Sequence, residues 1–367
     1  MTGKLNSSPA SGLCRYSPAL EQAVMAFQRE AYPQRPEGLL APRWKWMFLE
    51  SARRLGIEPW VWLYVKNGRV LAHQGAIPVQ CKIGNQQHPT GWFVETMALE
   101  SVRGRAIGPM VVQKALQDMR FNLSLGQTPQ MRTMQLAMGW EEIGPLRTYA
   151  LLLDPSAVLQ TKLRYRALVP LLAGGVRLSQ RMRRSIRRPK RRGDYAAKRI
   201  EHFGDDYDRL WDRVRGGLTC VAERDASFMN WKFVDQPGQE IRCIGIYDRG
   251  TLSAVGAVVI RDPDDDYAYR RALLLDLVVP VSDRAALWAL LEGVVGVCRA
   301  AQADVIMCDI GCAPLEEDLR AFGFLLREST RTFLLATAGL DKESQRIARN
   351  PDHWFLTRAD SDIDRPC

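Results

Sequence analysis

The chain has 367 residues, of which 46% are hydrophobic and 25% are charged, and it carries a net charge of +10 at pH 7. These values are typical of a globular protein, and the length suits two domains. The sequence has no run of about 18 apolar residues, and its first residues lack the apolar core of a signal peptide. We therefore expect a cytoplasmic protein whose eight scattered cysteines are reduced thiols rather than a disulfide framework or a zinc site.

The first 80 residues predict two helices followed by a hairpin. Residues 11–32 predict a short entry strand and a helix, and residues 43–54 predict a second helix rich in tryptophan and phenylalanine. Two β-favouring runs follow, at residues 60–65 and 70–79, and Asn-Gly at residues 67–68 joins them. Asn-Gly is the strongest short hairpin signal, because both residues accept the positive φ angles of a tight turn.

The next stretch combines a strand, a loop of small residues and a helix. Residues 92–99 are apolar and β-favouring, residues 103–108 form the loop, and Pro109 suits the first helical position. Such a loop bares backbone N–H groups, and the helix N-terminus adds partial positive charge, so together they form a cradle for a pyrophosphate. Arg103 and Arg105 add cationic donors. The spacing matches neither the P-loop nor the dinucleotide-binding fingerprint.

Three more elements complete the first half. Residues 121–126 predict a strand parallel to the one before it, because a helix separates the two. Residues 129–138 predict a short helix that ends at Gly139-Trp140. Residues 144–153 predict the strand that closes the first sheet.

The second half repeats this order of elements. Its expected elements are helices at 205–214 and 226–233, a hairpin at 241–247 and 252–261, a central strand at 272–279, a helix at 284–300, a strand at 304–309, a helix at 314–322 and a closing strand at 331–336. Individual residues repeat as well, since residues 41–48 align with 226–233 and Trp46 corresponds to Trp231. The pattern therefore predicts a tandem repeat of one domain.

Residues 91–116 resemble the acyl-CoA pyrophosphate loop of the GNAT superfamily of N-acyltransferases. The family pattern is Arg/Gln-x-x-Gly-x-Gly/Ala, in which Ala106 replaces the first glycine here and Gly108 is kept. The order of elements over residues 11–155 and the Gly139-Trp140 pair are also similar to that family. The resemblance implies an α/β (α+β) fold of two tandem GNAT-like domains. Each would be a mixed, mostly antiparallel sheet with a parallel central strand pair, flanked by helices.

The resemblance also implies an N-acyltransferase (acetyltransferase) that uses acetyl-CoA or another acyl-CoA as co-substrate and needs no metal. Main-chain N–H groups near the end of the central strand could polarise the thioester, because parallel strands that diverge leave donors unpaired. We predict a binding site for acyl-CoA made of nine residues: Met97, Ala98, Leu99, Arg103, Gly104, Arg105, Ala106, Ile107 and Gly108.

Glu95 is the candidate catalytic base, since it is an acid inside an apolar strand just before the loop. The alternative is a structural carboxylate that accepts hydrogen bonds. Many GNAT enzymes place a tyrosine four residues before a Gly-Phe pair, as the acid for the leaving thiolate. That position is Gln135 here, and Tyr149 is the candidate substitute. His73 is expected to be a satisfied surface histidine, or alternatively a polar group that lines the site.

The two copies differ at the junction of strand and helix. Residues 280–284 of the second copy contain no glycine and carry an acid where a phosphate would lie. We therefore expect acyl-CoA to bind only the N-terminal domain, residues 1–155. The C-terminal domain, residues 201–340, would shape the acceptor pocket or brace the first domain. Its Asp276 corresponds to Glu95 and would be structural or face the acceptor.

A basic connector, residues 156–200, joins the two domains. Residues 160–200 hold fourteen Lys or Arg and one acid, a net charge of +13 that leaves −3 for the rest of the chain. Three interpretations stay open: a solvated surface helix, a segment on an anionic membrane face, or a nucleic-acid contact. The apolar residues 167–176 favour the membrane over nucleic acid, and aromatic residues for base stacking are few. The membrane interpretation adds peripheral attachment at the inner membrane face to the cytoplasmic location.

The tail, residues 341–367, is expected to pack through Trp354 and Phe355. Its alternating acids lack the glycine and distal glutamate of a calcium loop: Asp360, Asp362 and Asp364. The ending resembles that of tandem GNAT proteins associated with bacterial cell-surface polysaccharide synthesis. The acceptor would then be a small-molecule or lipid-linked amine, such as an amino sugar. Two alternatives are a Fem-like transferase that takes its donor from aminoacyl-tRNA and a non-catalytic, degenerate tandem GNAT that acts as a binding module.

Overall fold

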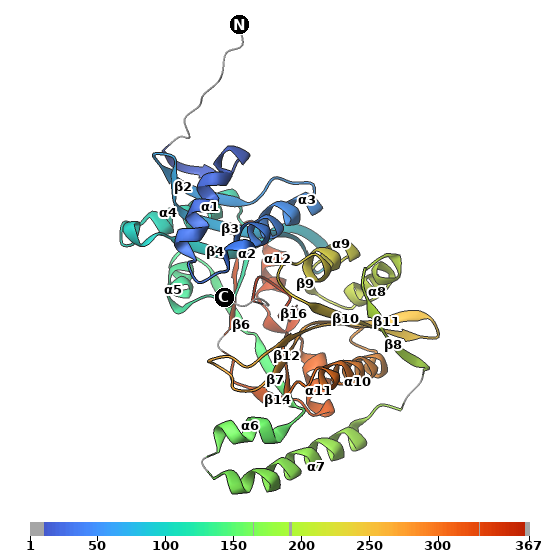
Figure 1. The fold of residues 1–367 in the computed structure, drawn as a ribbon. Helices are drawn as coiled ribbons and strands as arrows, with labels where there is room; N and C mark the ends of the chain where they lie inside the picture. The colour runs from blue at the N-terminus through green and yellow to red at the C-terminus, as the bar shows by residue number, and fades with distance from the viewer. Residues whose placement is uncertain (1–10, 164, 191–192, 330, 364–367) are drawn as a thin grey trace.

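A computed structural model describes residues 11–163, 165–190, 193–329 and 331–363. Two eight-stranded mixed sheets flanked by helices make up these residues, one sheet built mainly from each half of the chain. In Figure 1 the N-terminal half lies above the C-terminal half, and the green chain of β6 (Glu141–Pro145) and β7 (Arg147–Leu152) runs from one to the other. Asp364 lies outside the described residues, as do Arg164, Arg191 and Arg192 of the basic segment and residues 1–10.

The first sheet has the strand order β1-β2-β3-β4-β5-β15-β6, and β9 pairs with β3. Its remaining strands are β1 (Gly12–Arg15), β2 (Val61–Lys66), β3 (Arg69–Ile83), β4 (Gln86–Ala98), β5 (Asn122–Leu125), β9 (Cys220–Ala222) and β15 (Thr332–Ala336). Its helices are η1 (Pro18–Leu20), α1 (Glu21–Ala31), α2 (Glu37–Trp44), the π-helix η2 (Lys45–Glu50), α3 (Ser51–Arg54), η3 (Glu100–Val102), α4 (Ile107–Asp118) and α5 (Pro129–Ala137).

The second sheet has the equivalent order β8-β10-β11-β12-β13-β7-β14, and β16 pairs with β13. Its remaining strands are β8 (Tyr195–Ile200), β10 (Ile241–Asp248), β11 (Thr251–Arg261), β12 (Arg271–Val278), β13 (Val305–Gly311), β14 (Leu325–Arg327) and β16 (Leu356–Thr357). Its helices are α8 (Asp205–Gly216), α9 (Ala226–Met229), the π-helix η5 (Asn230–Val234), α10 (Arg284–Ala300), α11 (Ala313–Phe322), α12 (Lys342–Ala348) and η6 (Pro351–His353). Between the halves lie α6 (Pro155–Lys162), η4 (Arg166–Leu168) and α7 (Val169–Arg187).

The fold class is confirmed, and so are the elements predicted for both halves, except that the single strand predicted at residues 144–153 is two strands, β6 and β7. The hairpin turn at Asn67 and Gly68 has positive φ at both residues, and Arg249-Gly250 repeats this geometry. In each half the central strand runs antiparallel to the hairpin on one side and parallel to a strand on the other, β4 to β5 and β12 to β13. The tail packs through Trp354 and Phe355, which are both buried.

The closing strands were assigned to the wrong sheets. β7 lies in the second sheet between β13 and β14, and β15 lies in the first sheet between β5 and β6. The two halves thus exchange equivalent strands. The short connection between β6 and β7 explains why β7 leaves the first sheet. Leu146 alone separates the two strands, whereas a hairpin needs at least two turn residues. The chain therefore continues straight into the other sheet.

The halves also meet at equivalent residues. Trp46 and Trp231 stack with ring centres 4.7 Å apart and planes 13° apart. Each indole N–H donates to the backbone carbonyl of the other, at 2.7 and 2.9 Å. The residues that align in the sequence are thus partners across the interface, as they would be in a symmetric dimer.

Candidate functional site

Strand β4 carries a β-bulge at the candidate catalytic acid. His73 pairs with Met97 and Gly75 with Val94, so Glu95 and Thr96 together lie opposite Gln74. Glu95 has a φ of 53°, the left-handed region that costs a residue with a side chain about 1–2 kcal/mol. A bulge bends the strand and redirects its side chains, and bulges are frequent next to active sites.

A buried histidine holds this bulge. His73 Nδ1 lies 2.9 Å from the carbonyl oxygen of Glu95, and Trp44 Nε1 donates to His73 Nε2 at 3.4 Å. Both bonds are satisfied when Nδ1 carries the proton and the ring is neutral. Burial lowers the pKa of His73, which favours this neutral form. The expectation of a surface histidine is therefore wrong, because the ring is 1% exposed and packs among aromatic side chains.

The Glu95 carboxylate is clamped by two arginines. Arg43 lies 2.6 Å from it and Arg35 2.9 Å, and only 3% of the glutamate side chain is exposed. Arg35 also covers the ring of Tyr32, with its guanidinium carbon 3.5 Å from the ring centre. Burial, and then the Glu95 charge, raise the pKa of Tyr32 well above its usual value. The arginines neutralise the carboxylate, and this arrangement supports the structural role for Glu95 as well as a role in proton transfer.

Strands β4 and β5 part just beyond the middle of β4. They pair only at Trp92 and Leu123, and β5 ends at Leu125, whereas β4 continues to Ala98. The N–H of Leu99 donates to Leu71 on the β3 side. Successive N–H groups of a strand point to opposite edges, so the N–H of Ala98 points to the edge that β5 has left. Of the N–H groups predicted to polarise a carbonyl at the end of this strand, those near Met97 to Leu99, the one of Ala98 thus has the suitable orientation.

The loop predicted to hold a pyrophosphate follows directly after the end of β4 in the chain. Gly104 and Ala106 have φ angles of 79° and 60°, and α4 starts at Ile107, two residues before the predicted start at Pro109. Left-handed residues in such a turn direct successive N–H groups to one side, and the first N–H groups of α4 have no acceptor within the helix. Ala106 adopts here the conformation that suits the glycine of the family pattern.

The cradle and the end of β4 adjoin each other. A Cβ atom built on Gly108 would lie 3.8 Å from the Cβ of Ala98, with no closer atom around it. Arg103 Nε lies 3.4 Å from the Ala98 carbonyl oxygen, and both Arg103 and Arg105 are exposed. The end of β4 at Ala98 and the loop up to the start of α4 therefore lie side by side, whereas Leu99, also predicted to bind acyl-CoA, is buried.

Tyr149 is the candidate acid and Gln135 takes the place of the family's tyrosine, and both form hydrogen bonds with side chains other than Glu95. Tyr149 is on β7, in the second sheet, where its hydroxyl donates to Glu316 at 2.7 Å and accepts from Arg320 at 2.9 Å. The structure does not bring it together with Glu95. Gln135 is buried and donates to Ser124 on β5 at 3.0 Å.

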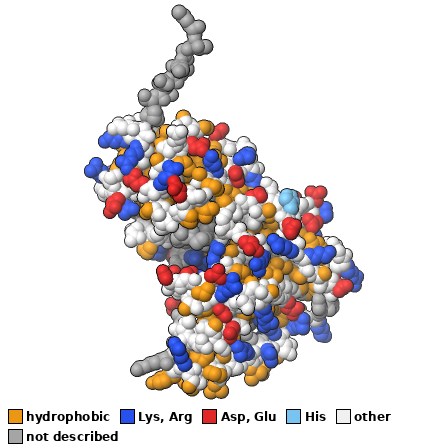
Figure 2. Space-filling model, viewed as in Figure 1, with side chains coloured by type: hydrophobic (Ala, Val, Ile, Leu, Met, Phe, Trp, Pro, Cys, Tyr) orange, Lys and Arg blue, Asp and Glu red, His pale blue; other side chains and the backbone are white. Residues whose placement is uncertain are grey.

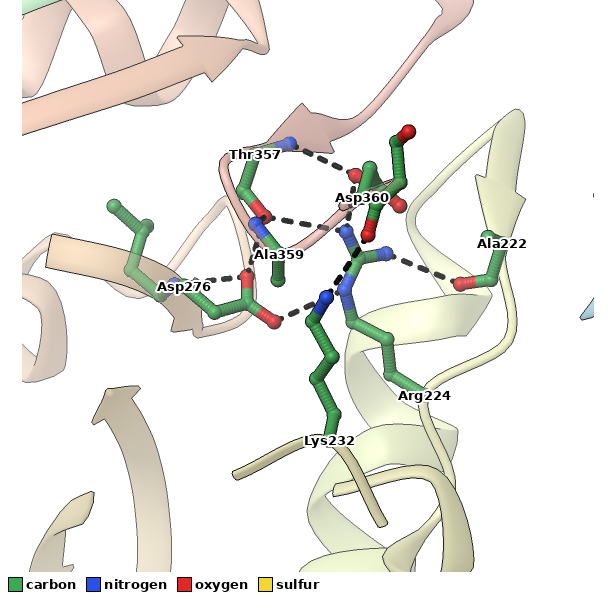
Figure 3. Close-up of polar contacts among 9 residues, drawn as sticks. Ala222, Arg224, Lys232, Asp276, Thr357, Ala359 and Asp360 are labelled. Atoms are coloured by element: carbon green, nitrogen blue, oxygen red, sulfur yellow. Dashed lines mark hydrogen bonds and ion pairs between the residues drawn. The ribbon is translucent and has the colours of Figure 1, made fainter. Parts of the chain in front are cut away.

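The second half repeats the bulge in its central strand, but the gap beside that strand is filled. Ala257 pairs with Asp276 and Val258 with Leu274, so Leu275 is the extra residue of β12. Asp276 is fully buried and accepts from Arg224 at 3.0 Å, and Arg224 also binds Asp360 of the tail at 2.5 Å (Figure 3). This network assigns Asp276 to structure rather than to an acceptor site.

The C-terminal tail fills the gap where β12 and β13 part. β16 pairs with the end of β13, and the N–H of Ala359 donates to the carbonyl of Leu275 at the bulge. Thr357 Oγ1 donates to Asp276 at 3.0 Å (Figure 3). In the first half no described strand takes the equivalent place beside β4. The gap in the second half is thus closed by the chain itself.

Sequence reasoning missed the residues that hold the bulge: Arg35, Arg43, Trp44 and the buried state of His73. The available signal was Arg43, a charged residue in a helix otherwise rich in buried tryptophan. Among the residues that the structure describes, no three His, Cys, Asp or Glu side chains gather as a metal ion would require.

Known structures share this fold, although no family model and no curated protein matches the sequence. A GCN5-related N-acetyltransferase from Anabaena variabilis matches with a TM-score of 0.60 and 12% identity over 88% of this chain and 71% of that one. A probable N-acyltransferase from Enterococcus faecalis has a TM-score of 0.56 and 10% identity over the same shares. N-myristoyltransferase from Saccharomyces cerevisiae with bound myristoyl-CoA has a TM-score of 0.52 and 12% identity over 88% of this chain and 82% of that one. These matches establish a fold of two GNAT-like domains.

Proposed function

We propose that the N-terminal half binds an acyl-CoA and transfers its acyl group to an amine. The observation that carries the proposal is the edge of β4 at Ala98 that β5 leaves unpaired, next to a loop with left-handed residues and the N-terminus of α4. The neighbours in fold add support, since they are N-acetyltransferases and an N-myristoyltransferase with bound myristoyl-CoA.

Each part of the site would serve one step. The N–H groups at the start of α4 and the partial positive charge of that helix end would hold the pyrophosphate, with Arg103 and Arg105 as flexible cations beside it. The N–H of Ala98 would stabilise the negative charge that develops on the thioester oxygen as the amine attacks. The thioester supplies the activated acyl group, and the thiolate leaves as the amide forms.

Glu95 is the proposed proton acceptor for the attacking amine. Ion pairs with Arg35 at 2.9 Å and Arg43 at 2.6 Å hold its carboxylate in place. Tyr149 keeps no proposed role in the first half, because its hydroxyl contacts lie in the second sheet.

For the acceptor we propose a small-molecule or lipid-linked amine, such as an amino sugar of a cell-surface polysaccharide pathway. The support is the resemblance of the chain's ending to tandem GNAT proteins of that kind. Transfer would take place in the cytoplasm, where acyl-CoA is available. The second half would brace the first, since its own gap holds β16.

Calorimetry with acetyl-CoA and with myristoyl-CoA tests the proposal. Gly108→Glu adds a charge beside the cradle while leaving the backbone unstrained, because the glycine lacks a positive φ and has only Ala98 nearby. We expect affinity for the better ligand to fall tenfold or more, about 1.4 kcal/mol. The matched control, Ser282→Glu, adds the same charge at the exposed junction of the second half and should leave affinity unchanged.

The outcomes separate the candidate functions. Unchanged affinity in a folded Gly108→Glu protein would refute the assignment of the cradle. Binding without turnover on any amine would favour a binding module. If neither acyl-CoA binds but charged tRNA does, the Fem-like alternative replaces the proposal.

A further inference from the structure

Helix α7, in the basic segment between the halves, has one side packed on the protein. Val169 and Ala173 are buried, and the Arg184 guanidinium lies 4.3 Å from the ring centre of Phe322 on α11. Arg184 also donates through Nε to the Phe322 carbonyl at 2.8 Å. These contacts fix the rotation of the helix, so its opposite side is the one that faces outward.

The outward side is apolar. Its exposed fractions are 75% for Leu171, 60% for Leu178, 55% for Met182 and 74% for Ile186. Spacings of seven, four and four residues place these side chains on one face, at about 100° per residue. Leu171 also lines, with Leu172 and Leu325 of β14, an open hollow of about 510 Å³. Figure 2 shows hydrophobic side chains gathered at the lower end of the molecule, where α7 lies in Figure 1.

Arginines flank this apolar face on both sides. The same angular spacing places Arg183 on one border and Arg181 on the other, each about 100° from the middle of the apolar face, whereas Arg177 and Arg187 lie further towards the packed side. Arg181, Arg183 and Arg187 are exposed, and no ion pair is recorded for them among the described residues. Arg177 pairs with Asp154 at 2.9 Å, and Arg188 pairs with Glu292 at 2.8 Å.

We propose that α7 lies in the plane of an anionic membrane surface, with its apolar face among the acyl chains and its arginines at the headgroups. The face is roughly 20 Å long, which suits a helix that lies on a bilayer. No helix among the described residues is long and apolar enough to cross one.

The arginines beside the apolar face indicate which of three partners covers it: a bilayer, a nucleic acid or a second copy of the chain. An anionic bilayer satisfies both the apolar face and the cations on its two borders. A nucleic acid would leave four large apolar side chains in water. A second copy seated on the same face would bring arginines against arginines. The proposal does not depend on acyl transfer.

Flotation with vesicles tests the proposal directly. The wild-type protein should float with vesicles of phosphatidylcholine and phosphatidylglycerol and stay behind with phosphatidylcholine alone. Two variants test the charge and the apolar face separately. The first removes charge and is Arg181→Ser/Arg183→Ser/Arg187→Ser. The second makes the apolar face polar and is Leu171→Gln/Leu178→Gln/Ile186→Gln. We expect each to lower the partition coefficient at least tenfold, since each basic residue near the surface is worth about 1 kcal/mol.

A matched control removes the same charge elsewhere. Arg53→Ser/Lys66→Ser/Lys342→Ser affects three exposed residues away from α7 and should float like the wild type. All substituted side chains are exposed, and thermal unfolding by circular dichroism confirms that each variant is folded. The proposal is overturned if the wild type ignores anionic vesicles or if the glutamine variant floats undiminished. It is also overturned if light scattering shows a dimer that the glutamine variant abolishes, or if the protein shifts tRNA at physiological salt without floating.

Discussion

Glu95 combines a left-handed backbone with a carboxylate shared between Arg35 and Arg43. Glu95→Gln keeps the shape of the side chain and removes its charge. We expect turnover to fall roughly 100-fold, the scale of a lost general base, while affinity for acyl-CoA stays nearly unchanged. Steady-state kinetics and calorimetry on the same preparation measure the two quantities.

Asp276→Asn provides the comparison in the second half. It removes a charge partner of Arg224, whose side chain is completely buried, so we expect a loss of stability of about 3–5 kcal/mol with kcat of the folded protein retained. Normal turnover by Glu95→Gln, together with a lowered melting temperature, would instead make Glu95 a structural carboxylate like Asp276.

His73 should make stability depend on pH. An unfolded histidine binds a proton near pH 6.5, and burial lowers the pKa of His73 in the folded protein. The unfolded state therefore binds more protons below pH 6.5, so the contribution is complete above that pH and is lost as the pH falls towards the lowered pKa. The ring lies against Trp44, Phe27, Phe48 and the Glu95 carbonyl, and the charges that act on it are those of Glu95, which raises its pKa, and Arg35, which lowers it.

Urea unfolding at pH 7.5 and 5.5 measures this effect. The loss of stability between these values should be smaller for His73→Gln than for the wild type, because glutamine does not titrate. Equal losses in the two proteins would mean that His73 is protonated in the folded state, and the tautomer that bonds Glu95 and Trp44 would be wrong.

At the scale of elements, local patterns predicted most of the fold. Hairpins, helices and parallel pairs follow from turn residues and hydrophobic period, which are local properties. The bulge at Glu95 escaped prediction, because one extra residue barely disturbs the alternation of an apolar strand. The exchange of β7 and β15 escaped too, since both strands have the same pattern and each sheet offers an equivalent place.

The candidate site, like the fold, was predicted only where the signal is local in the sequence. Residues 103–108 carry their own signal, in small residues and cations before a helix. The contacts of Glu95 do not, because Arg43 of α2 and Arg35 of the loop before α2 lie more than 50 residues away in the chain. The outward face of α7 became definable only once the packing of Arg184 on Phe322 fixed the rotation of the helix.

At the scale of the molecule, the exchange should make the halves inseparable. A chain that ends at residue 155 contains β5 and β6 but lacks β15, which joins them, and it leaves β7 without partners. We expect this fragment to be unfolded by circular dichroism and to gain structure when residues 156–367 are expressed with it. A cooperative thermal transition of the fragment alone would show that residues 1–155 are an independent domain.

The exchanged strands also determine when, during translation, the first sheet can be completed. On the ribosome, β5 and β6 emerge about 190–210 residues before β15, which at 5–20 residues per second amounts to roughly 10–40 s. During that interval the facing edges of β5 and β6 stay unpaired, and unpaired strand edges recruit other chains. The N-terminal half thus depends on nearly the last strand to be translated. Dense polysomes would place equivalent edges of neighbouring nascent chains close together, so we expect the yield of native protein to depend on the spacing of ribosomes and on chaperones that shield strand edges.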